Sequence, residues 1–217
     1  LDVVQHTMRV VFYGYMGSRA RLNRELGRPA ATPEAGSNTW AIGPSRSASG
    51  NAMLIINPHL QWGDFYTYME VHLTAPGVDL YGAPQIGFPM PVVGFNRRLG
   101  WSRTVNTIDT VDFYKLTPQS DGYLFDGRVE QFETDVATFR VKESARTYTE
   151  ENVRVMKSKH GPVVHNQSGQ MIAMRIAGLD RPRMLEQWFR MGSASNLKEF
   201  QAALRMASIP MWNACYA

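Results

Sequence analysis

The spacing of apolar residues along the chain changes near residue 37, from a helical pattern to a strand pattern. Before it, apolar residues recur at near-helical spacing: Val3, Val4, Val10, Val11, Tyr15 and Leu22. This spacing predicts a helix over residues 2–27, which Gly27 and Pro29 would end. Residues 28–36 are small, polar and proline-containing, which predicts an exposed linker.

From Ser37 onward, short apolar runs bounded by turn residues predict a series of strands. The predicted strands are Thr39–Ile42, Ala52–Ile56, Phe65–Thr74, Val78–Tyr81, Pro91–Phe95, Gly100–Val105, Val111–Leu116, Tyr123–Phe125, Val129–Val141, Asn152–Lys157, Met171–Ile176 and Met211–Tyr216. We expect Asn57-Pro58-His59 to break the second strand, because proline has no N–H to donate to a ladder.

Helical spacing returns late in the chain. The two apolar stripes are Leu185, Trp188, Phe189 and Leu197, Phe200, Leu204. Asn196 and Glu199 form the pattern of a capping box before the second stripe. Many strands followed by helices favour an α+β fold over a doubly wound sheet.

Composition limits the classes of partner. The chain has 217 residues, of which 44% are hydrophobic and 19% charged, as in a soluble globular protein of one large or two small domains. The net charge is +4, but Lys and Arg are scattered, so no nucleic-acid partner is expected. A single cysteine, Cys215, allows no internal disulfide. No apolar run approaches the ~18 residues that a membrane-spanning helix needs.

Gly36-Ser37 stands at the border between the two patterns. Ser37 is in no G-x-S-x-G or Ser-x-x-Lys motif, and no histidine stands in a triad context. A serine hydroxyl needs a base, and an N-terminal α-amine with a pKa of about 7.7–8.0 can serve as one. That role requires cleavage between Gly36 and Ser37, and a glycine lets the hydroxyl approach the preceding carbonyl. From the residues alone, an ordinary loop serine is the simpler interpretation.

Several motifs change that interpretation. In order, they are Ser37–Gly43, Ser45-Arg46-Ser47, Asn57-Pro58-His59, His72-Leu73 with Pro76-Gly77, Gly94-Phe95-Asn96, Trp101–Val105 and Met211-Trp212-Asn213. Together they resemble the start of the β-subunit in the penicillin acylase family of N-terminal nucleophile (Ntn) hydrolases. This family includes penicillin amidases, acyl-homoserine-lactone acylases and cyclic-lipopeptide acylases. The resemblance covers Ser37 to Ala217.

The resemblance implies an Ntn-hydrolase αββα sandwich, incomplete in this chain. Residues 1–36 would be the C-terminal helix of the α-subunit and a spacer, and residues 37–217 the N-terminal part of the β-subunit. We therefore expect a fragment of a longer precursor, whose missing α-subunit would be the partner after processing into a heterodimer. The family also implies a periplasmic or secreted location and no organic cofactor.

Four residues match catalytic positions of the family. Ser37 matches the serine whose hydroxyl attacks an amide carbonyl while its own amine takes the proton. Val105 stands where the family supplies a backbone N–H to the oxyanion, and Asn213 where it supplies a side-chain amide. His59 stands near the amine of the nucleophile. Taken alone, each of the last three could equally be an ordinary structural residue.

The substrate implied by the resemblance is an N-acylated small molecule. It would be a β-lactam antibiotic, an N-acyl-homoserine lactone or an acylated peptide. Leu60 and Val93 match positions that line the acyl pocket of the family, and an apolar pocket suits an acyl chain. His59 favours the lactone and lipopeptide acylases, whereas Asp109 and Asp112 favour the penicillin amidases, so both readings stay open.

Asp109-Thr110-Val111-Asp112 offers oxygen atoms for a hard cation. By the resemblance, Asp109, Val111 and Asp112 match a structural calcium site; the alternative is a polar turn that opens a strand. Two rival functions also stay open. One is an unprocessed, inactive precursor fragment that acts as a β-rich structural or binding module. The other is a different hydrolase that uses His59 or His160 with a metal.

Overall fold

The computed structural model describes residues 18–29, 36–60, 62–63, 66–106, 108–178, 183–209 and 212–217. The predicted helical residues 2–17, most of the linker, Phe65 and Met211 lie outside this part. The chain divides into two units, of which the first comprises Leu1–Thr110 with Ala177–Ala217 and the second Val111–Ile176. Among the described residues, no helix is long and apolar enough to cross a membrane.

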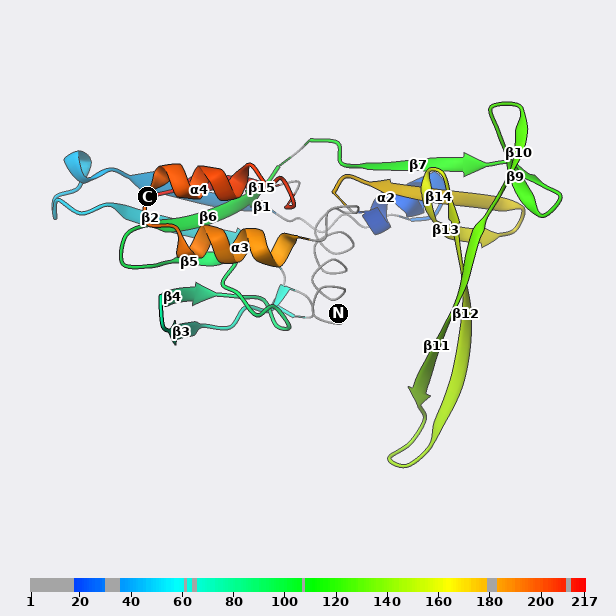
Figure 1. Ribbon diagram of the computed structural model, residues 1–217, viewed down its shortest axis with the longest axis horizontal. Helices are drawn as coiled ribbons and strands as arrows, with labels where there is room; N and C mark the ends of the chain where they lie inside the picture. Colours follow the sequence, from blue (N-terminus) through cyan, green and yellow to red (C-terminus); the bar gives the residue numbers. More distant parts are fainter. Residues whose placement is uncertain are drawn as a thin grey trace. The chain divides into compact units, whose positions relative to one another are not determined.

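A five-stranded antiparallel sheet is the centre of the first unit (Figure 1). Across the sheet the strands are β15 (Trp212–Tyr216), β6 (Gly100–Val105), β5 (Val93–Phe95), β4 (Val78–Ala83) and β3 (Val71–Ala75). A separate antiparallel pair consists of β1 (Gly36–Ile42) and β2 (Met53–His59). The helices are α2 (Ser18–Glu25), the 3-10 turn η2 (Pro44–Arg46), α3 (Met184–Ser193) and α4 (Leu197–Leu204).

One face of this sheet packs against α3 and α4. The core there consists of Leu80, Leu99, Trp101, Met191, Ala194, Phe200 and Ala203. Gly192 lets α3 approach closely, since a Cβ at this position would lie 3.2 Å from the Trp101 ring. Asn196 caps α4 as predicted, because its side chain accepts a hydrogen bond from the Glu199 N–H at 3.0 Å. The Glu199 carboxylate in turn accepts a hydrogen bond from the N–H of Ser195, one residue before the cap.

The β1–β2 pair lies against β6 and β15, on the other face of the sheet. Thr39 and Ser102 are joined through their hydroxyls. Leu54, the cross-strand partner of Ala41, lies over Gly100, where a Cβ would be 3.2 Å from its side chain. Thr39 of β1 therefore corresponds to Ser102 of β6, and Ala41 corresponds to Gly100 through its partner Leu54. Residue numbers rise along β1 where they fall along β6, so the two strands run antiparallel. The described part of the first unit therefore has three layers: helices, sheet and β1–β2 pair.

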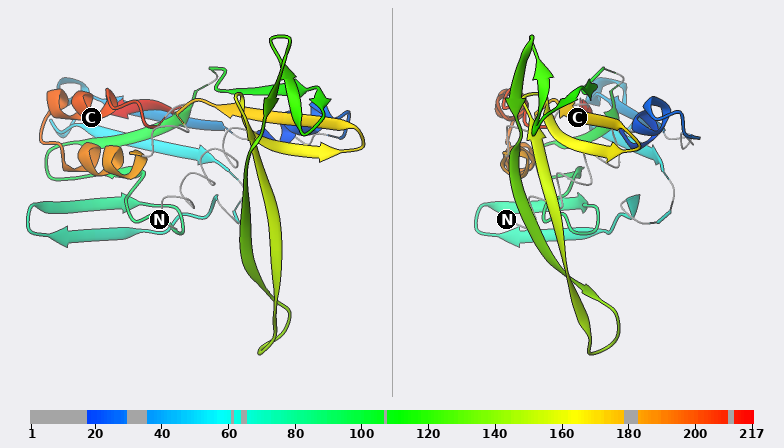
Figure 2. Two further views of the ribbon diagram at one scale, coloured as in Figure 1. Left: turned by 45° about the vertical axis from the view of Figure 1, so that its right-hand side comes forward. Right: turned by 90° about the vertical axis from the view of Figure 1, so that its right-hand side faces the viewer.

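The second unit is built of strands alone (Figure 2). Its five-stranded sheet has the order β11 (Glu133–Lys142), β12 (Tyr148–Ser158), β13 (Gly161–Gln167), β14 (Gln170–Ile176) and β7 (Val111–Leu116). A smaller sheet has the order β10 (Arg128–Gln131), β9 (Gly122–Phe125) and β8 (Pro118–Gln119). Leu116, Tyr123, Met171 and Ala173 form its core cluster. Figure 2 shows β11 and β12 as a long two-stranded arm.

The predicted break at Asn57-Pro58-His59 is wrong, because β2 continues to His59. Pro58 is the cross-strand partner of Ser37. In the described sheet, β2 has a neighbour on one side only, so a residue without an N–H is tolerated there. The first strand also begins at Gly36 rather than Thr39, which places Ser37 inside the pair instead of in a loop.

Further strand boundaries differ from the prediction. The strand predicted from Phe65 begins at Val71, preceded by an isolated bridge from Tyr68 to Gln85. The predicted strand Val129–Val141 is two strands in different sheets, separated at Phe132, whose ring packs on Tyr123 at 4.8 Å. An apolar pattern cannot show such a change of partner strand. In addition, β12 begins earlier than predicted, and β8 was not predicted as a strand.

Gly82 on β4 and Gly94 on β5 are cross-strand partners. A Cβ at Gly82 would lie 2.3 Å from the Val93 carbonyl oxygen. Because backbone must shift to relieve this clash, Gly82→Ala should lower the free energy of unfolding by about 3 kcal/mol in urea unfolding of the full chain. Gly43→Ala is the control: a Cβ added there would have no neighbouring atom within 4 Å, and a change below ~1 kcal/mol is expected. Equal stabilities would refute the steric argument.

Candidate active site

The hydroxyl of Ser37 lies beside the carbonyl of the preceding residue. Its Oγ donates a hydrogen bond to Gly36 O at 2.6 Å, in a partly buried position. The group that could attack and the carbonyl that could be attacked are therefore neighbours in the described conformation. This proximity is what an internal acyl shift at Gly36–Ser37 requires.

Strand alternation places the Ser37 side chain toward the sheet. Ser37 and Thr39 are half-buried, whereas Asn38 and Trp40 between and after them are exposed. Since Thr39 contacts Ser102 and β1 runs antiparallel to β6, the Ser37 end of β1 lies toward the end of β6 that carries Thr104 and Val105.

Asn213 is on the same face of the sheet as Ser102 and Thr104. It is the cross-strand partner of Thr104, and its Nδ2 donates to Thr104 Oγ1 at 3.1 Å. Its Oδ1 accepts a hydrogen bond from Asn106 Nδ2 at 2.9 Å. Within the described part of the chain, the second N–H of the Asn213 amide makes no hydrogen bond.

Val105 is the last residue of β6, and its cross-strand partner Trp212 directly precedes Asn213. The structure therefore brings the two residues that were matched to oxyanion donors, Val105 and Asn213, to one end of adjacent strands. The Ser37 end of β1 lies over the same region. Three of the four predicted catalytic residues share this corner of the first unit.

His59 reaches the cleavage position from a different direction. It is the cross-strand partner of Gly36, and a Cβ on Gly36 would lie 3.5 Å from its Nδ1. Its Nε2 accepts a hydrogen bond from Asn38 Nδ2 at 3.3 Å, on the exposed face of β1. The imidazole therefore adjoins the backbone of Gly36, on the opposite face of the strand pair from the Ser37 side chain. The Asn38 contact leaves the proton of a neutral imidazole on Nδ1, which faces Gly36.

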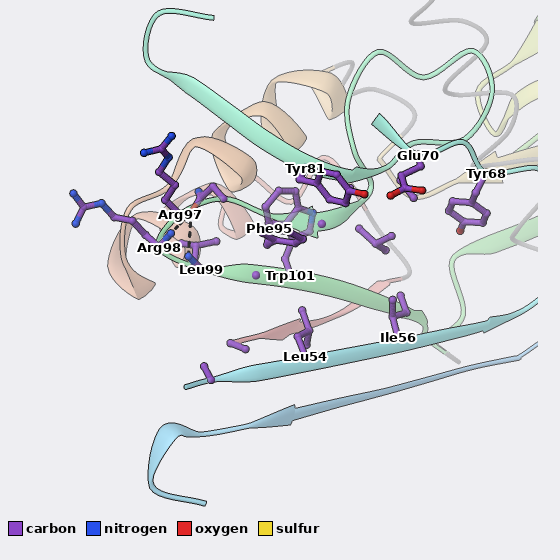
Figure 3. A pocket seen from close by; sticks show the side chains of 18 of the residues that line it. Leu54, Ile56, Tyr68, Glu70, Tyr81, Phe95, Arg97, Arg98, Leu99 and Trp101 are labelled. Carbon is purple, nitrogen blue, oxygen red and sulfur yellow. Dashed lines mark hydrogen bonds between the residues drawn. The ribbon is translucent and has the colours of Figure 1, made fainter. Parts of the chain in front are cut away.

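Leu60 and Val93 line two different hollows. Leu60 lines one of about 330 Å³ together with Pro58, Trp62, Tyr66, Thr67 and Tyr68. Val93 lines a larger one of about 880 Å³ between β2 and strands β4 to β6 (Figure 3). In Figure 3, Leu54 and Ile56 face Tyr81, Phe95 and Trp101 across the larger hollow, with Arg97 and Arg98 at one end and Tyr68 at the other. Tyr68 borders both hollows, so the two adjoin each other.

The residues matched to a calcium site do not make a closed site among the described residues. The Asp109 carboxylate is paired with the Arg21 guanidinium at 2.8 Å. Asp112 is exposed on β7, and the Val111 side chain is buried. Calcium takes six to eight oxygens, and the described residues contain no group of three or more His, Cys, Asp or Glu that could hold a metal ion. Calcium binding stays a prediction, and no step below depends on it.

Two residues beside the candidate site were not predicted. Thr104 and Asn106 hold the Asn213 amide, although they stand 109 and 107 positions away in sequence. His160, by contrast, is stacked on Tyr114 with ring centroids 3.9 Å apart in the second unit. That contact covers one face of the imidazole ring.

Comparisons with known proteins support the resemblance. The penicillin amidase family model matches residues 4–217. The acyl-homoserine lactone acylase PvdQ of Pseudomonas savastanoi pv. phaseolicola is 36% identical over 192 residues, which are 83% of this chain and 24% of the relative. Aculeacin-A acylase of Actinoplanes utahensis is 27% identical over 187 residues, which are 82% of this chain and 23% of the relative. The chain thus spans about a quarter of the length of these curated relatives.

A solved structure supports the fold. The thermostable penicillin G acylase from Alcaligenes faecalis superposes with a TM-score of 0.68 at 23% sequence identity, covering 82% of this chain and 33% of that chain. The predicted α+β class agrees with this match and with the strand-rich architecture, and the predicted resemblance is confirmed. The chain belongs to the penicillin amidase family.

Proposed function

We propose that this chain carries the nucleophile of an amidohydrolase that removes the acyl group from N-acylated small molecules. The observation that carries the proposal is the hydrogen bond from Ser37 Oγ to Gly36 O at 2.6 Å, in a chain of the penicillin amidase family. The proposed nucleophile is the hydroxyl of Ser37 after the Gly36–Ser37 bond has been cleaved. The remainder of the precursor would supply the second subunit.

The cleavage would be an internal acyl shift. Ser37 Oγ attacks the Gly36 carbonyl carbon, and its proton passes to the Ser37 nitrogen as the amide C–N bond breaks. The resulting ester is hydrolysed by water, which leaves a carboxylate on Gly36 and a free α-amine on Ser37. His59 adjoins Gly36 and presents Nδ1 toward it, so its imidazole lies beside the residue whose carbonyl is attacked.

The same serine would then act on the substrate. The α-amine, whose ordinary pKa is about 7.7–8.0, takes the Oγ proton as Oγ attacks the amide carbonyl. The negative charge on the carbonyl oxygen is stabilised by the Val105 backbone N–H and the free N–H of Asn213. The amine product leaves with a proton, and water hydrolyses the acyl-serine ester by the reverse sequence of proton transfers.

The hollow beside Leu60 is the proposed acyl pocket. Pro58, the cross-strand partner of Ser37, lies at its border, and the other described lining residues are Leu60, Thr67 and aromatic side chains. An apolar hollow next to the nucleophile suits the acyl chain rather than the amine. The names of the relatives, acyl-homoserine lactone acylase and aculeacin-A acylase, favour an acylated lactone or lipopeptide over a β-lactam.

A bulkier residue at position 60 should shorten the accepted acyl chain. In the full-length precursor, Leu60→Trp should lower kcat/KM for decanoyl-homoserine lactone by about tenfold or more, because lost pocket volume excludes distal methylenes. Butanoyl-homoserine lactone should be affected much less. The control is Leu197→Trp, at an exposed position on α4. A uniform loss over all chain lengths would contradict the pocket assignment, whereas no hydrolysis of any acyl amide by a cleaved precursor would contradict the function.

An unprocessed β-rich module is the alternative function. It predicts a chain that stays in one piece, whereas autoproteolysis predicts two masses that divide between Gly36 and Ser37. Measurement of the intact mass of the purified precursor separates the two before any activity is assayed.

A further inference from the structure

A pair of hydroxyl groups joins the strand that carries Ser37 to the central sheet of the first unit. Thr39 Oγ1 on β1 and Ser102 Oγ on β6 are hydrogen-bonded to each other. Thr39 Oγ1 also donates a hydrogen bond to the carbonyl oxygen of Ile55 on β2 at 2.9 Å. One threonine hydroxyl therefore connects three strands, β1, β2 and β6.

The Ile55 carbonyl determines the direction of both hydrogen bonds. A carbonyl oxygen can only accept, so the single hydroxyl proton of Thr39 goes to Ile55. Ser102 must then donate its own proton to Thr39 Oγ1. Ser102 is buried, and a buried hydroxyl without a partner is destabilising. The serine therefore holds the Thr39 side chain in one position.

This contact lies two residues from the candidate nucleophile, on the same half-buried face of β1. Because β1 runs antiparallel to β6 and Thr39 contacts Ser102, Ser37 lies toward Thr104, two residues further along β6. Two strand residues span only about 7 Å. A shift of Thr39 along β6 therefore moves Ser37 by a similar amount.

The backbone N–H of Val105, the residue after Thr104, points away from β15. Gly100 and Ala217 exchange both of their backbone hydrogen bonds, at 2.7 and 3.1 Å, so they are a hydrogen-bonded pair. The register of β6 with β15 continues without a shift to Val105 and Trp212. Hydrogen-bonded and non-hydrogen-bonded pairs alternate, which makes Val105 and Trp212 a non-hydrogen-bonded pair. The N–H that the proposed mechanism uses is therefore not taken up by β15.

We propose that the hydrogen bond from Ser102 to Thr39 is a positioning contact that sets the distance between the Ser37 hydroxyl and the Val105 N–H. This inference rests on the proposed function, in which the hydroxyl attacks the substrate and the N–H stabilises the oxyanion. The two groups belong to different layers of the first unit. The hydroxyl pair joins those layers two or three residues away from each group.

Without the hydroxyl pair, the two layers would be held here by apolar contacts such as that of Leu54 with Gly100. Apolar attraction is non-directional and permits small shifts, whereas a hydrogen bond fixes the atoms that it joins. A misplacement of a reacting group by about 1 Å can cost about a hundredfold in rate. The loss falls on attack and not on substrate binding, so it should be seen in kcat.

Two substitutions remove this hydrogen bond from opposite ends. Ser102→Ala removes the donor and leaves the hydrogen bond from Thr39 to Ile55 in place, whereas Thr39→Val keeps the side-chain shape without a hydroxyl. Each should lower kcat per cleaved molecule about tenfold, with KM changed less than about twofold. Thr39→Ser retains the hydroxyl and should keep kcat within about threefold of the wild type.

The experiment measures hydrolysis of one acyl-homoserine lactone by the full-length precursor, with cleavage followed by intact mass. Ser37 Oγ and Gly36 O are on one strand, so every variant should still be cleaved, which also shows that it folds. The control is Thr147→Val, which removes the contact with Ser144 Oγ at 2.6 Å in the second unit. It should leave kcat and KM within about twofold of the wild type.

A kcat of the cleaved Ser102→Ala variant within about twofold of the wild type would overturn the positioning role alone. So would losses that multiply in the double variant, because two residues that act through one hydrogen bond cannot each contribute in full. Equal losses in Thr39→Ser and Thr39→Val would assign the effect to packing, and this comparison decides if Ser102→Ala does not fold. An uncleaved, inactive wild type would overturn the proposed function itself, and the inference with it.

Discussion

Replacing Ser37 by alanine is expected to leave the full-length precursor uncleaved and without acylase activity. The variant lacks the Oγ that donates to Gly36 O at 2.6 Å, so no atom is left to attack the Gly36 carbonyl. Without cleavage there is also no free α-amine at position 37. The substitution therefore removes nucleophile and base together, and hydrolysis of acyl amides should fall by at least about 10⁴-fold.

The measurement is the intact mass of the purified variant, followed by its rate of acyl-amide hydrolysis. Ser49→Ala is the matched control, because Ser49 is an exposed serine in the connection between β1 and β2 and its hydroxyl contacts only that connection. The control should be cleaved and active like the wild type. Efficient cleavage of the Ser37→Ala variant would rule out autoproteolysis by Ser37.

The substitution Ser37→Cys tests whether cleavage depends on a nucleophilic atom at position 37 or on the local backbone conformation. Ser37→Cys retains a nucleophilic atom beside Gly36 O, so it should still cleave, whereas alanine should not. The comparison attributes cleavage to the atom at this position and not to the local strand conformation, which both substitutions leave intact. If neither variant is cleaved, cleavage requires a hydroxyl at position 37, and a thiol cannot replace it.

The candidate nucleophile and the candidate oxyanion donors could be named from the sequence because each is part of a local motif. Ser37 follows Gly36, Val105 follows Trp101-Ser102-Arg103-Thr104, and Asn213 follows Trp212. What could not be predicted is how these motifs meet. Their proximity depends on β15 pairing with β6 and on β1 crossing the same face, which are contacts between residues more than sixty positions apart.

For His59, the sequence predicted the position near Ser37 but not the face of the strand on which the side chain lies. The motif Asn57-Pro58-His59 placed it near the nucleophile, and its pairing with Gly36 agrees with that. In a strand, alternation decides on which face the His59 ring lies. Because a break at Pro58 was expected, the alternation could not be extended to His59 from the sequence. Once β2 continues through Pro58, residues 57 and 59 must share the exposed face with Asn38. The histidine then adjoins the backbone of Gly36 instead of the Ser37 hydroxyl.

The substitution Asn213→Ala should be the second most damaging change, through kcat alone. The free N–H of its amide is one of two neutral donors proposed for the oxyanion, and removal of one such donor typically costs about 10²–10³ in kcat. KM should change little, because the donor acts on charge that develops only in the transition state. Steady-state kinetics of the cleaved, full-length precursor on one acyl-homoserine lactone measures both quantities.

Asn51→Ala is the control, since Asn51 is an exposed asparagine at the other end of the β1–β2 pair. It should leave kcat and KM within about twofold of the wild type. A rise in KM at unchanged kcat for Asn213→Ala would mean that the amide binds substrate and transition state equally, and would remove it from the oxyanion site. Autoproteolysis provides a second reading of the same group. If the amide also stabilises the oxyanion formed at Gly36, the variant precursor should be cleaved more slowly, and the tetrahedral intermediates of both reactions would share one donor.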